Sequence, residues 1–403
     1  MSRILIAWEL GANLGHLTRL LPIAEILQQQ AHQVLFVVRD TEAAAVLLEP
    51  RGFAFISAPY YIGKTKIAQP PVNYAELLIA DAYLAKPSLI GRIRSWLALY
   101  QLYKPDIILI DYAPSALLAA HIEHIPAVCI DNGFGMPPLV SPMPTIRPFE
   151  TVSTHRLSQA ETLVLTAINA VSHHFQGPLF KQFVELFNTQ ATILATFPEL
   201  DHYGVREHGD YVGPIFSYIG SLSASWQTET KTKIFAYLRP DMPGLQALLK
   251  VLASIDTEVV CVIPGLTRLN RELAKKLRVY TQPVLLNSFI VKANLVISYA
   301  GSGLTANALL AGVPLLLLPY TIEQYLQARR IEQLGAGLML NQERSESVIK
   351  QALDKILSEP HFHKAASDFA VRHVGFHPAQ AANYVVKSIE AIIQRQSIKY
   401  GLN

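Results

Sequence analysis

The chain has 403 residues, too many for one ordinary hydrophobic core, so its length predicts two domains. With 51% hydrophobic and only 16% charged residues, its composition excludes a disordered domain. The formal charge is +3, from 34 basic and 31 acidic side chains that form no long runs, which argues against a nucleic-acid-binding groove.

Three local features bear on location and redox chemistry. Cys129 and Cys261 lie inside apolar runs without histidines at ligand spacing, which predicts buried, reduced core residues. The apolar run within 1–11 is interrupted by Glu9 and predicts a first strand, not a secretory signal. The uncharged segment 294–322 contains glycines and prolines in strand-turn-helix-strand order, which argues against a membrane span. We therefore expect a cytoplasmic protein.

Short aliphatic runs alternate with helical patterns through the first half of the chain. This order predicts a doubly wound α/β domain, in which helices cover both faces of a parallel sheet. The run 191–196 is expected to be its last strand. The other expected elements are strands at 3–9, 33–38, 54–57, 106–111 and 125–131, and helices at 17–30, 41–51, 89–103, 114–123 and about 150–190.

The alternation repeats after a segment rich in Gly and Pro, so we expect domains at 1–201 and 231–377, a linker at 202–230 and a final helical segment at 378–403 that packs back on the first domain. Two such halves predict a cleft, with ligands outside the carboxyl ends of strands. The expected elements are strands at 233–238, 257–263, 283–287, 294–298, 313–319 and 336–340, and helices at 243–254, 268–277, from about 303, and at 322–333.

The first turn between strand and helix carries a candidate base. Gly11 and Gly15 permit a tight turn and a close approach of a ligand, and His16 follows at the expected helix start. An imidazole near its ordinary pKa can take a proton from a hydroxyl at neutral pH, and the helix N-terminus disfavours the imidazolium form. The alternative is that His16 caps the helix or packs against it.

A carboxylate that follows an apolar strand strengthens the first interpretation. Asp111 ends the run 106–111, where a carboxylate contributes nothing to packing but emerges at the edge expected to carry the chemistry. Hydrogen-bonded to the second ring nitrogen, it would fix the tautomer and stabilise the imidazolium. The alternative is a cap of the next helix through Ser115. Asp131, at the end of the next strand, is a reserve candidate.

The second half offers a matching turn for an anion. A strand, a glycine turn and a helix start follow one another at 294–305, where backbone amides and two hydroxyls can bind a diphosphate. Glu323 and Gln324 follow the next buried strand and can hold sugar hydroxyls, or Glu323 is a helix cap. Arg239, after the strand 233–238, adds positive charge or is a solvated surface arginine. The candidate residues of the turn are Tyr299, Gly301, Ser302, Gly303, Leu304 and Thr305.

In this order, the motifs resemble those of the inverting GT-B glycosyltransferases, both the macrolide or UDP-glycosyltransferase-like family and the peptidoglycan GlcNAc transferase MurG. Residues 11–37 look like their opening turn and helix, 106–120 like the strand that supplies the acidic partner of the histidine, and 211–215 like their linker. Residues 297–328 look like their donor-binding motif. The likeness covers nearly the whole chain, and the first turn and the last of these segments are its specific parts.

The resemblance implies a GT-B fold of two Rossmann-like domains and a metal-independent hexosyltransferase without a cofactor. His16 would be the base, Asp111 its orienting carboxylate, and 301–305 the diphosphate cradle, with Glu323 and Gln324 on the donor sugar. Phe289, in a segment similar to the Phe-Ile of MurG, would contact the donor. The donor would be a uridine or thymidine diphosphate sugar and the acceptor a small apolar or lipid-like molecule; no nucleic acid or protein partner is expected.

Two departures keep alternatives open. Tyr299 stands where the natural-product family usually has His, and the segment with the base-stacking Trp is absent, which favours a non-catalytic nucleotide-sugar-binding protein. An epimerase of the same fold is the other alternative. The segments 59–74 and 131–149 are long loops that suit an acceptor pocket or a static role. The segment 88–104 is a core helix or a membrane-surface patch for a lipid acceptor.

Overall fold

The chain divides into two compact units. The computed structural model describes residues 1–11, 14–63, 65, 67–217, 225–229 and 232–399. The first unit comprises Met1–Pro198, Val205–Phe216 and His377–Asn403, and the second comprises Glu199–Gly204 and Ser217–Phe376. The chain therefore passes between the units four times, and part of the expected linker, 218–224 and 230, lies outside the described residues.

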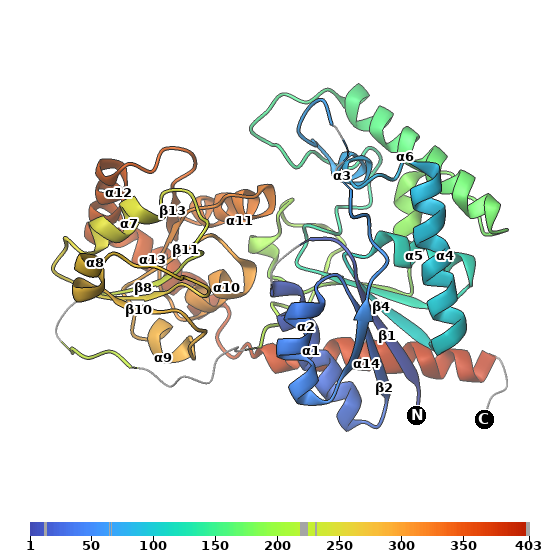
Figure 1. Cartoon of the computed structure of the whole chain (residues 1–403), viewed down its shortest axis with the longest axis horizontal. Helices are drawn as coiled ribbons and strands as arrows, with labels where there is room; N and C mark the ends of the chain where they lie inside the picture. The colour runs from blue at the N-terminus through green and yellow to red at the C-terminus, as the bar shows by residue number, and fades with distance from the viewer. Residues whose placement is uncertain (12–13, 64, 66, 218–224, 230–231, 400–403) are drawn as a thin grey trace. The chain divides into compact units, whose positions relative to one another are not determined.

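The described residues of the first unit form a seven-stranded parallel sheet in the order β3-β2-β1-β4-β5-β6-β7 (Figure 1). Its central strands β1, β4 and β5 are buried on both faces, which explains why they have no alternation of apolar and polar residues. The strands are β1 (Arg3–Trp8), β2 (Gln33–Val38), β3 (Ala54–Ser57), β4 (Ile107–Asp111), β5 (Ala127–Asp131), β6 (Ala191–Leu194) and β7 (Asp210–Tyr211).

Helices cover both faces of this sheet. Leu5 and Ala7 belong to a core formed with α3 to α6, whereas the equally buried Ile4 and Ile6 point to the opposite face because side chains alternate along a strand. Helix α14 belongs to this unit and packs against α1 (Figure 1). The helices are α1 (Gly15–Gln29), α2 (Thr41–Leu47), α3 (Tyr74–Ala80), α4 (Lys86–Tyr103), α5 (Pro114–Ile122), α6 (Thr154–His174) and α14 (Pro378–Lys399), with short 3-10 turns at Glu49–Arg51, Phe183–Phe187 and Pro198–Leu200.

Helix α4 occupies the segment 88–104, for which two interpretations were open. Ile93 and Trp96 on this helix are fully buried, and the buried Arg92 forms an ion pair with Asp81 at 2.5 Å. These side chains face the core and not a membrane surface, so the interpretation as a core helix fits the structure.

The second unit repeats the architecture with a six-stranded parallel sheet in the order β10-β9-β8-β11-β12-β13 among its described residues. Its strands are β8 (Lys233–Tyr237), β9 (Glu258–Val262), β10 (Arg278–Tyr280), β11 (Leu295–Ser298), β12 (Leu315–Leu317) and β13 (Gly337–Met339). Its helices are α7 (Leu245–Leu252), α8 (Arg271–Lys276), α9 (Asn287–Ile290), α10 (Ser302–Leu310), α11 (Ile322–Gln333), α12 (Glu346–Ser358) and α13 (Pro360–Arg372).

Helices α3, α9, α12 and α13 were not predicted, and three predicted elements differ clearly from those observed. The last strand of the first sheet is β7 and not the run 191–196, because the chain returns after 199–204 to pair with β6. The strand expected at 283–287 is replaced by β10, which lies earlier in the chain, since Pro283 offers no N–H for a ladder. The helix expected over 150–190 ends at His174, where left-handed Gln176 and then Gly177 and Pro178 stop it.

Candidate active site

The strand order of each sheet reverses at one point, and the predicted site residues follow the strands at these points. In the first sheet the reversal lies between β1 and β4, which pair so that Trp8 is beside Asp111. In the second it lies between β8 and β11. Because crossover helices leave opposite faces on either side of such a point, the strand ends there are free to bind a ligand.

The structure brings His16 and Asp111 together. The imidazole Nδ1 lies 3.1 Å from Oδ1 of Asp111, which is fully buried, while 12% of the His16 side chain is exposed. The ring of Trp8 stacks on the imidazole with centroids 4.9 Å apart. A hydrogen bond from Nδ1–H to the carboxylate leaves Nε2 as the nitrogen that can take a proton.

The carboxylate is also held by a cation that sequence reasoning missed. Arg19 donates from Nη2 to Oδ1 of Asp111 at 2.5 Å and from Nε to Oδ2 at 3.3 Å. Burial raises the pKa of Asp111, but the charges of Arg19 and His16 and their hydrogen bonds outweigh it and lower the pKa overall. Asp111 is therefore ionised at neutral pH. The available signal was an arginine three residues after His16 on a helix face that also carries Leu17 and Leu20.

The reserve candidate Asp131 has a different set of contacts. Its Oδ1 accepts hydrogen bonds from the backbone N–H groups of Gly133 and Gly135, both at 2.8 Å. A carboxylate that accepts two amides folds the chain after β5 into a tight turn. Of the two strand-end carboxylates, Asp111 is the one that contacts His16.

The turn before His16 has one position that requires glycine. Gly11 has a φ of +82°, and a Cβ atom there would lie 2.6 Å from Nε2 of His16. Gly15 begins α1 and has no atom within 4 Å of such a Cβ, so the structure gives no steric reason for glycine there. Tyr112 also has a positive φ, 46°, directly after Asp111, and its carbonyl accepts the N–H of Leu10 at 3.0 Å. This bond ties the two strand ends together.

A buried carboxyl group lies just before the same turn. Glu9 accepts hydrogen bonds from the backbone N–H groups of Ser115 and Ala116 at 3.1 and 3.2 Å, at the start of α5. Burial raises the pKa of Glu9 from 4.5 to about 7, and the nearby charge of Arg92 lowers it only in part. Glu9 thus links β1 to the helix that follows Asp111.

This group predicts a pH dependence of stability. Between pH 4.5 and about 7, folded Glu9 holds a proton that the unfolded chain has lost, so the free energy of unfolding should fall as pH rises through that range. The shift in the pKa of Glu9 corresponds to about 3 kcal/mol of unfolding free energy. We expect Glu9→Gln to remove this part of the dependence in urea unfolding at pH 5 and 8. Trp226→Phe, introduced into both the wild type and Glu9→Gln, confines the tryptophan fluorescence to Trp8 and Trp96 of the first unit. An equal pH dependence of the unfolding free energy in the two proteins would contradict the prediction.

In the second unit, α10 begins at a glycine. Gly301 at its N-cap has an extended backbone and no side chain that could cap the first N–H groups of the helix. Ser302, Gly303 and Leu304 are half-buried in the first turn. Thr305 is fully buried, and its Oγ1 has no partner among the described residues. A buried hydroxyl without a partner among the described residues, beside a helix N-terminus, suits an anion.

Aromatic side chains and one arginine surround this helix start. The rings of Tyr237 and Tyr320 lie 6.3 and 5.9 Å from that of Tyr299. The guanidinium carbon of Arg239 lies 5.8 Å from the centroid of the Tyr320 ring, and its Nε forms an ion pair with Oδ1 of Asp241 at 3.0 Å. Burial raises the pKa of Tyr299, so its hydroxyl keeps its proton and can donate a hydrogen bond to an oxyanion.

The loop after β12 is fixed by two side chains. Gln324 is nearly buried and accepts the N–H of Tyr320 through Oε1 at 3.1 Å, and the half-buried Glu323 precedes it on α11. Arg344 donates hydrogen bonds to the carbonyl oxygens of Pro319 and Pro243, the latter at 3.0 Å. Sequence reasoning missed this arginine. Gln324 thus serves the turn itself, with only a small part of its side chain exposed.

Phe289 lies in the core, contrary to its expected donor contact. Its side chain is fully buried and stacks on Phe235 with centroids 5.6 Å apart. Trp226 packs edge-on at 5.4 Å and donates from Nε1 to the Phe289 carbonyl at 3.0 Å. Packing on these apolar neighbours leaves no face of the ring for a nucleotide base.

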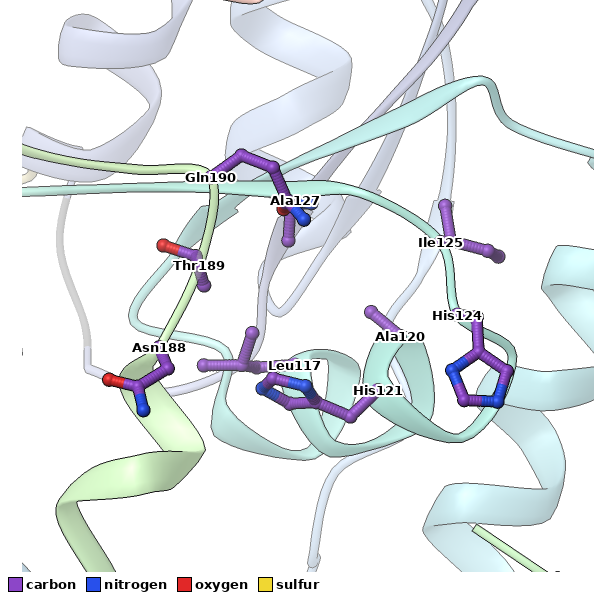
Figure 2. A pocket seen from close by; sticks show the side chains of 9 residues that line it. All are labelled: Leu117, Ala120, His121, His124, Ile125, Ala127, Asn188, Thr189 and Gln190. Carbon is purple, nitrogen blue, oxygen red and sulfur yellow. Dashed lines mark hydrogen bonds between the residues drawn. The ribbon is translucent and has the colours of Figure 1, made fainter. Parts of the chain in front are cut away.

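A cavity of about 190 Å³ lies elsewhere in the first unit. Figure 2 shows that His121 and His124 from the end of α5 line it together with residues 188–190. It adjoins Ala127, the first residue of β5, and therefore lies at the amino edge of the sheet, opposite the edge that carries Asp111. It is not part of the site built around His16.

The described residues contain neither a candidate metal site nor a candidate membrane span. No group of three or more His, Cys, Asp or Glu side chains in the described part of the chain is arranged to hold a metal ion. None of the described helices combines the length and the apolar character needed to cross a bilayer.

Comparison with known proteins identifies the fold. Residues 246–391 match the Erythromycin biosynthesis protein CIII-like, C-terminal domain. The glycosyltransferase VinC, solved in complex with dTDP, superposes with a TM-score of 0.68 at 14% identity, over 96% of this chain and 100% of that one. The chain has the GT-B fold of two parallel-sheet α/β domains. Its predicted fold class and its resemblance to macrolide-type glycosyltransferases are confirmed.

Curated relatives of this GT-B protein share the resemblance at low identity. A PGL/p-HBAD biosynthesis rhamnosyltransferase of Mycobacterium bovis is 25% identical over 66% of this chain, and the match spans 63% of that relative's length. A PGL/p-HBAD biosynthesis glycosyltransferase of Mycobacterium tuberculosis is 24% identical over 92% of this chain and 88% of its own length.

Proposed function

We propose that this protein is an inverting, metal-independent glycosyltransferase that moves a sugar from a nucleoside diphosphate sugar to a hydroxyl of an apolar or lipid-like acceptor, with His16 as the general base. The observation that carries the proposal is the contact of 3.1 Å between His16 and the fully buried Asp111. It supports a base because the carboxylate orients the ring and stabilises the imidazolium that forms. The relatives named glycosyltransferases support the reaction class.

In this reaction Nε2 of His16 takes the proton of the acceptor hydroxyl. The acceptor oxygen attacks the anomeric carbon from the face opposite the nucleotide, and the bond from that carbon to the diphosphate oxygen breaks. The diphosphate leaves with the bonding electron pair, and the configuration at carbon inverts because the acceptor oxygen attacks from the opposite face. Asp111 keeps its charge and stabilises the imidazolium until the proton is passed to solvent.

The second unit would hold the leaving diphosphate. The N–H groups at the start of α10, the Thr305 hydroxyl and Tyr299 would donate to its oxygens, and Arg239 would add positive charge. We propose a thymidine or uridine diphosphate sugar as donor, which the dTDP complex of VinC supports. Glu323 on α11 would contact the sugar.

Thr305→Val tests the diphosphate role. Because Oγ1 has no partner among the described residues, the substitution should leave the stability unchanged or raise it, whereas a structural hydroxyl would lower it. The affinity for dTDP or UDP should fall roughly tenfold, the value of one charge-assisted hydrogen bond. Calorimetry and thermal unfolding of both proteins measure the two effects. Unchanged affinity would remove Thr305 from the site.

The surroundings of His16 support an apolar acceptor. The centroid of the Tyr112 ring lies 6.3 Å from that of the imidazole. The ring also packs against Tyr74 and Phe134, with centroid distances of 6.0 and 6.3 Å. Phe134 and the buried Met136 come from the loop after β5, which suits an acceptor pocket. The names of the PGL/p-HBAD biosynthesis relatives support a lipid-like acceptor.

Acceptor-dependent release of nucleotide tests the whole proposal. The protein is incubated with dTDP- and UDP-sugars, with and without a panel of apolar alcohols and phenols, and the free diphosphate is measured. A transferase releases it only with an acceptor, and NMR of the product should show an inverted anomeric carbon. Donor turnover without any acceptor would favour an epimerase, and binding without turnover would favour the non-catalytic alternative.

A further inference from the structure

The cavity at the amino edge of the first sheet is lined by two separate segments. Leu117, Ala120 and His121 come from α5, and residues 188–190 come from the segment before β6 (Figure 2). Leu117 and Ala120 are almost fully buried and form the apolar part of the lining. At about 190 Å³, the cavity is smaller than the roughly 300 to 1,000 Å³ of sites for drug-sized ligands. Its size therefore suits a small molecule with a single ring.

His121 contributes a hydrogen-bond acceptor. Its Nε2 lies 2.8 Å from the carbonyl oxygen of Leu186, which can only accept, so Nε2 carries the proton. Nδ1 of the neutral ring then has a lone pair. Burial lowers the pKa of His121, which keeps the ring neutral at neutral pH. The imidazole also packs edge-on against Phe180 with centroids 5.3 Å apart, so its direction is fixed.

Gln190 contributes a donor from the other segment. Its Oε1 accepts the backbone N–H of Ala127 at 2.7 Å, which fixes the orientation of the amide and leaves its N–H₂ group as a donor. The backbone N–H of Gln190 donates to the Ala127 carbonyl oxygen at 3.1 Å, so two hydrogen bonds hold this residue at the start of β5. In Figure 2 the His121 ring points toward residues 188–190, whereas the His124 ring points away from them.

The lining indicates the chemical class of the ligand. No Asp, Glu, Lys or Arg is among the described residues that line the cavity, so a charged ligand would lose water without gaining a counter-charge. One hydroxyl group can donate to Nδ1 of His121, and another can accept from the amide of Gln190. Leu117 and Ala120 suit hydrogens bound to carbon. A compact carbon ring with several hydroxyl groups meets these conditions together.

We propose that this cavity is a binding site for a free neutral monosaccharide, held by His121 and Gln190. The cavity adjoins the first residue of β5, whereas Asp111 ends β4 at the opposite edge of the sheet. The site is therefore separate from that of the proposed transfer reaction. Its occupation does not depend on that reaction, so the two can be tested apart.

NMR titration of histidine-labelled protein with D-glucose, L-rhamnose and N-acetyl-D-glucosamine tests the inference. His121→Phe identifies the His121 signal and keeps a ring against Phe180. A ligand of this size should bind with a dissociation constant on the order of 1 mM. Gln190→Glu keeps an oxygen for the N–H of Ala127 but loses the amide donor, so binding should weaken about fivefold or more. His124→Ala changes an exposed ring that points away and should bind as the wild type does.

Charged and nucleotide ligands supply the controls. D-Glucuronate should bind more weakly than the neutral sugars, because the cavity offers it no counter-charge. Saturating dTDP or UDP should leave the affinity for the sugar unchanged, because a donor site lies elsewhere. Gln190 is exposed, so its variant should fold; if it does not, Ala120→Leu, which fills part of the cavity, takes its place.

A saturable shift of the His121 signal by at least one neutral sugar, weakened in Gln190→Glu and unchanged by the nucleotides, supports the inference. No shift with any of the three sugars at about 100 mM, roughly a hundred times the expected constant, overturns it. Equal affinity of Gln190→Glu and the wild type, or a shift that either nucleotide abolishes, also overturns it. Glucuronate that binds as tightly as the neutral sugars overturns the assignment of a neutral ligand.

Discussion

His16→Ala is expected to lower turnover by about 10²- to 10⁴-fold, the contribution of a positioned general base. The substitution leaves Asp111 paired with Arg19, so no buried charge loses its ion pair and the fold should persist. The donor residues lie on other elements, and the affinity for nucleoside diphosphate should therefore stay at the wild-type value. Initial rates at saturating donor, with calorimetry in parallel, measure both effects.

A matched control is His124→Ala. This histidine is exposed just after α5, beside the cavity at the amino edge of the sheet. Its replacement should leave turnover unchanged. Turnover of His16→Ala within twofold of the wild type would contradict the assignment of the base. Loss of diphosphate binding together with turnover would instead point to a disturbed fold.

Asp111→Asn is expected to have two separate effects. The amide can present its N–H₂ group to Nδ1 of His16, which then accepts a hydrogen bond, so the proton moves to Nε2 and the base is lost. Turnover should fall by up to about 10⁴-fold, as for a catalytic histidine held in the wrong tautomer. The buried charge of Arg19 would also lose its carboxylate, which costs about 3 to 5 kcal/mol of the unfolding free energy.

The control for this substitution lies just before the same strand. Asp106→Asn changes an exposed carboxylate just before β4, whose Oδ2 accepts the N–H of Arg3 at 2.7 Å. It should have a small effect on stability and none on turnover. Urea unfolding and initial rates measure both substitutions. Wild-type turnover of Asp111→Asn at unchanged pH would show that the carboxylate does not set the tautomer.

The sequence was sufficient for the regular parts of the fold. Strands such as β1 and β4 are continuous aliphatic runs between helical segments, and a polar residue at the end of such a run indicates the edge where ligands bind. This made His16 and Asp111 predictable as a pair. The misplaced strand β10 shows the limit, because three residues that end a helical pattern, Arg278–Tyr280, carry no periodicity of their own.

Contacts that depend on the direction of a side chain were beyond the sequence. Arg19 interrupts the apolar face of α1 and resembles any solvated charge until Asp111 is placed beside it. Phe289 has the residue type of a donor contact, but only the packing of Trp226 and Phe235 shows that it faces the core. A motif indicates which residues are present, whereas tertiary packing decides which of them reach a ligand.

The binding of nucleoside diphosphates tests the account most directly, because every step of the proposed reaction requires it. Calorimetric titration of the wild-type protein with dTDP and with UDP should show saturable binding at one site for at least one of them. The affinity should be kept in His16→Ala and weakened in Thr305→Val. If neither nucleotide binds the wild-type protein, it cannot transfer sugars from either class of donor, and the proposed function is wrong.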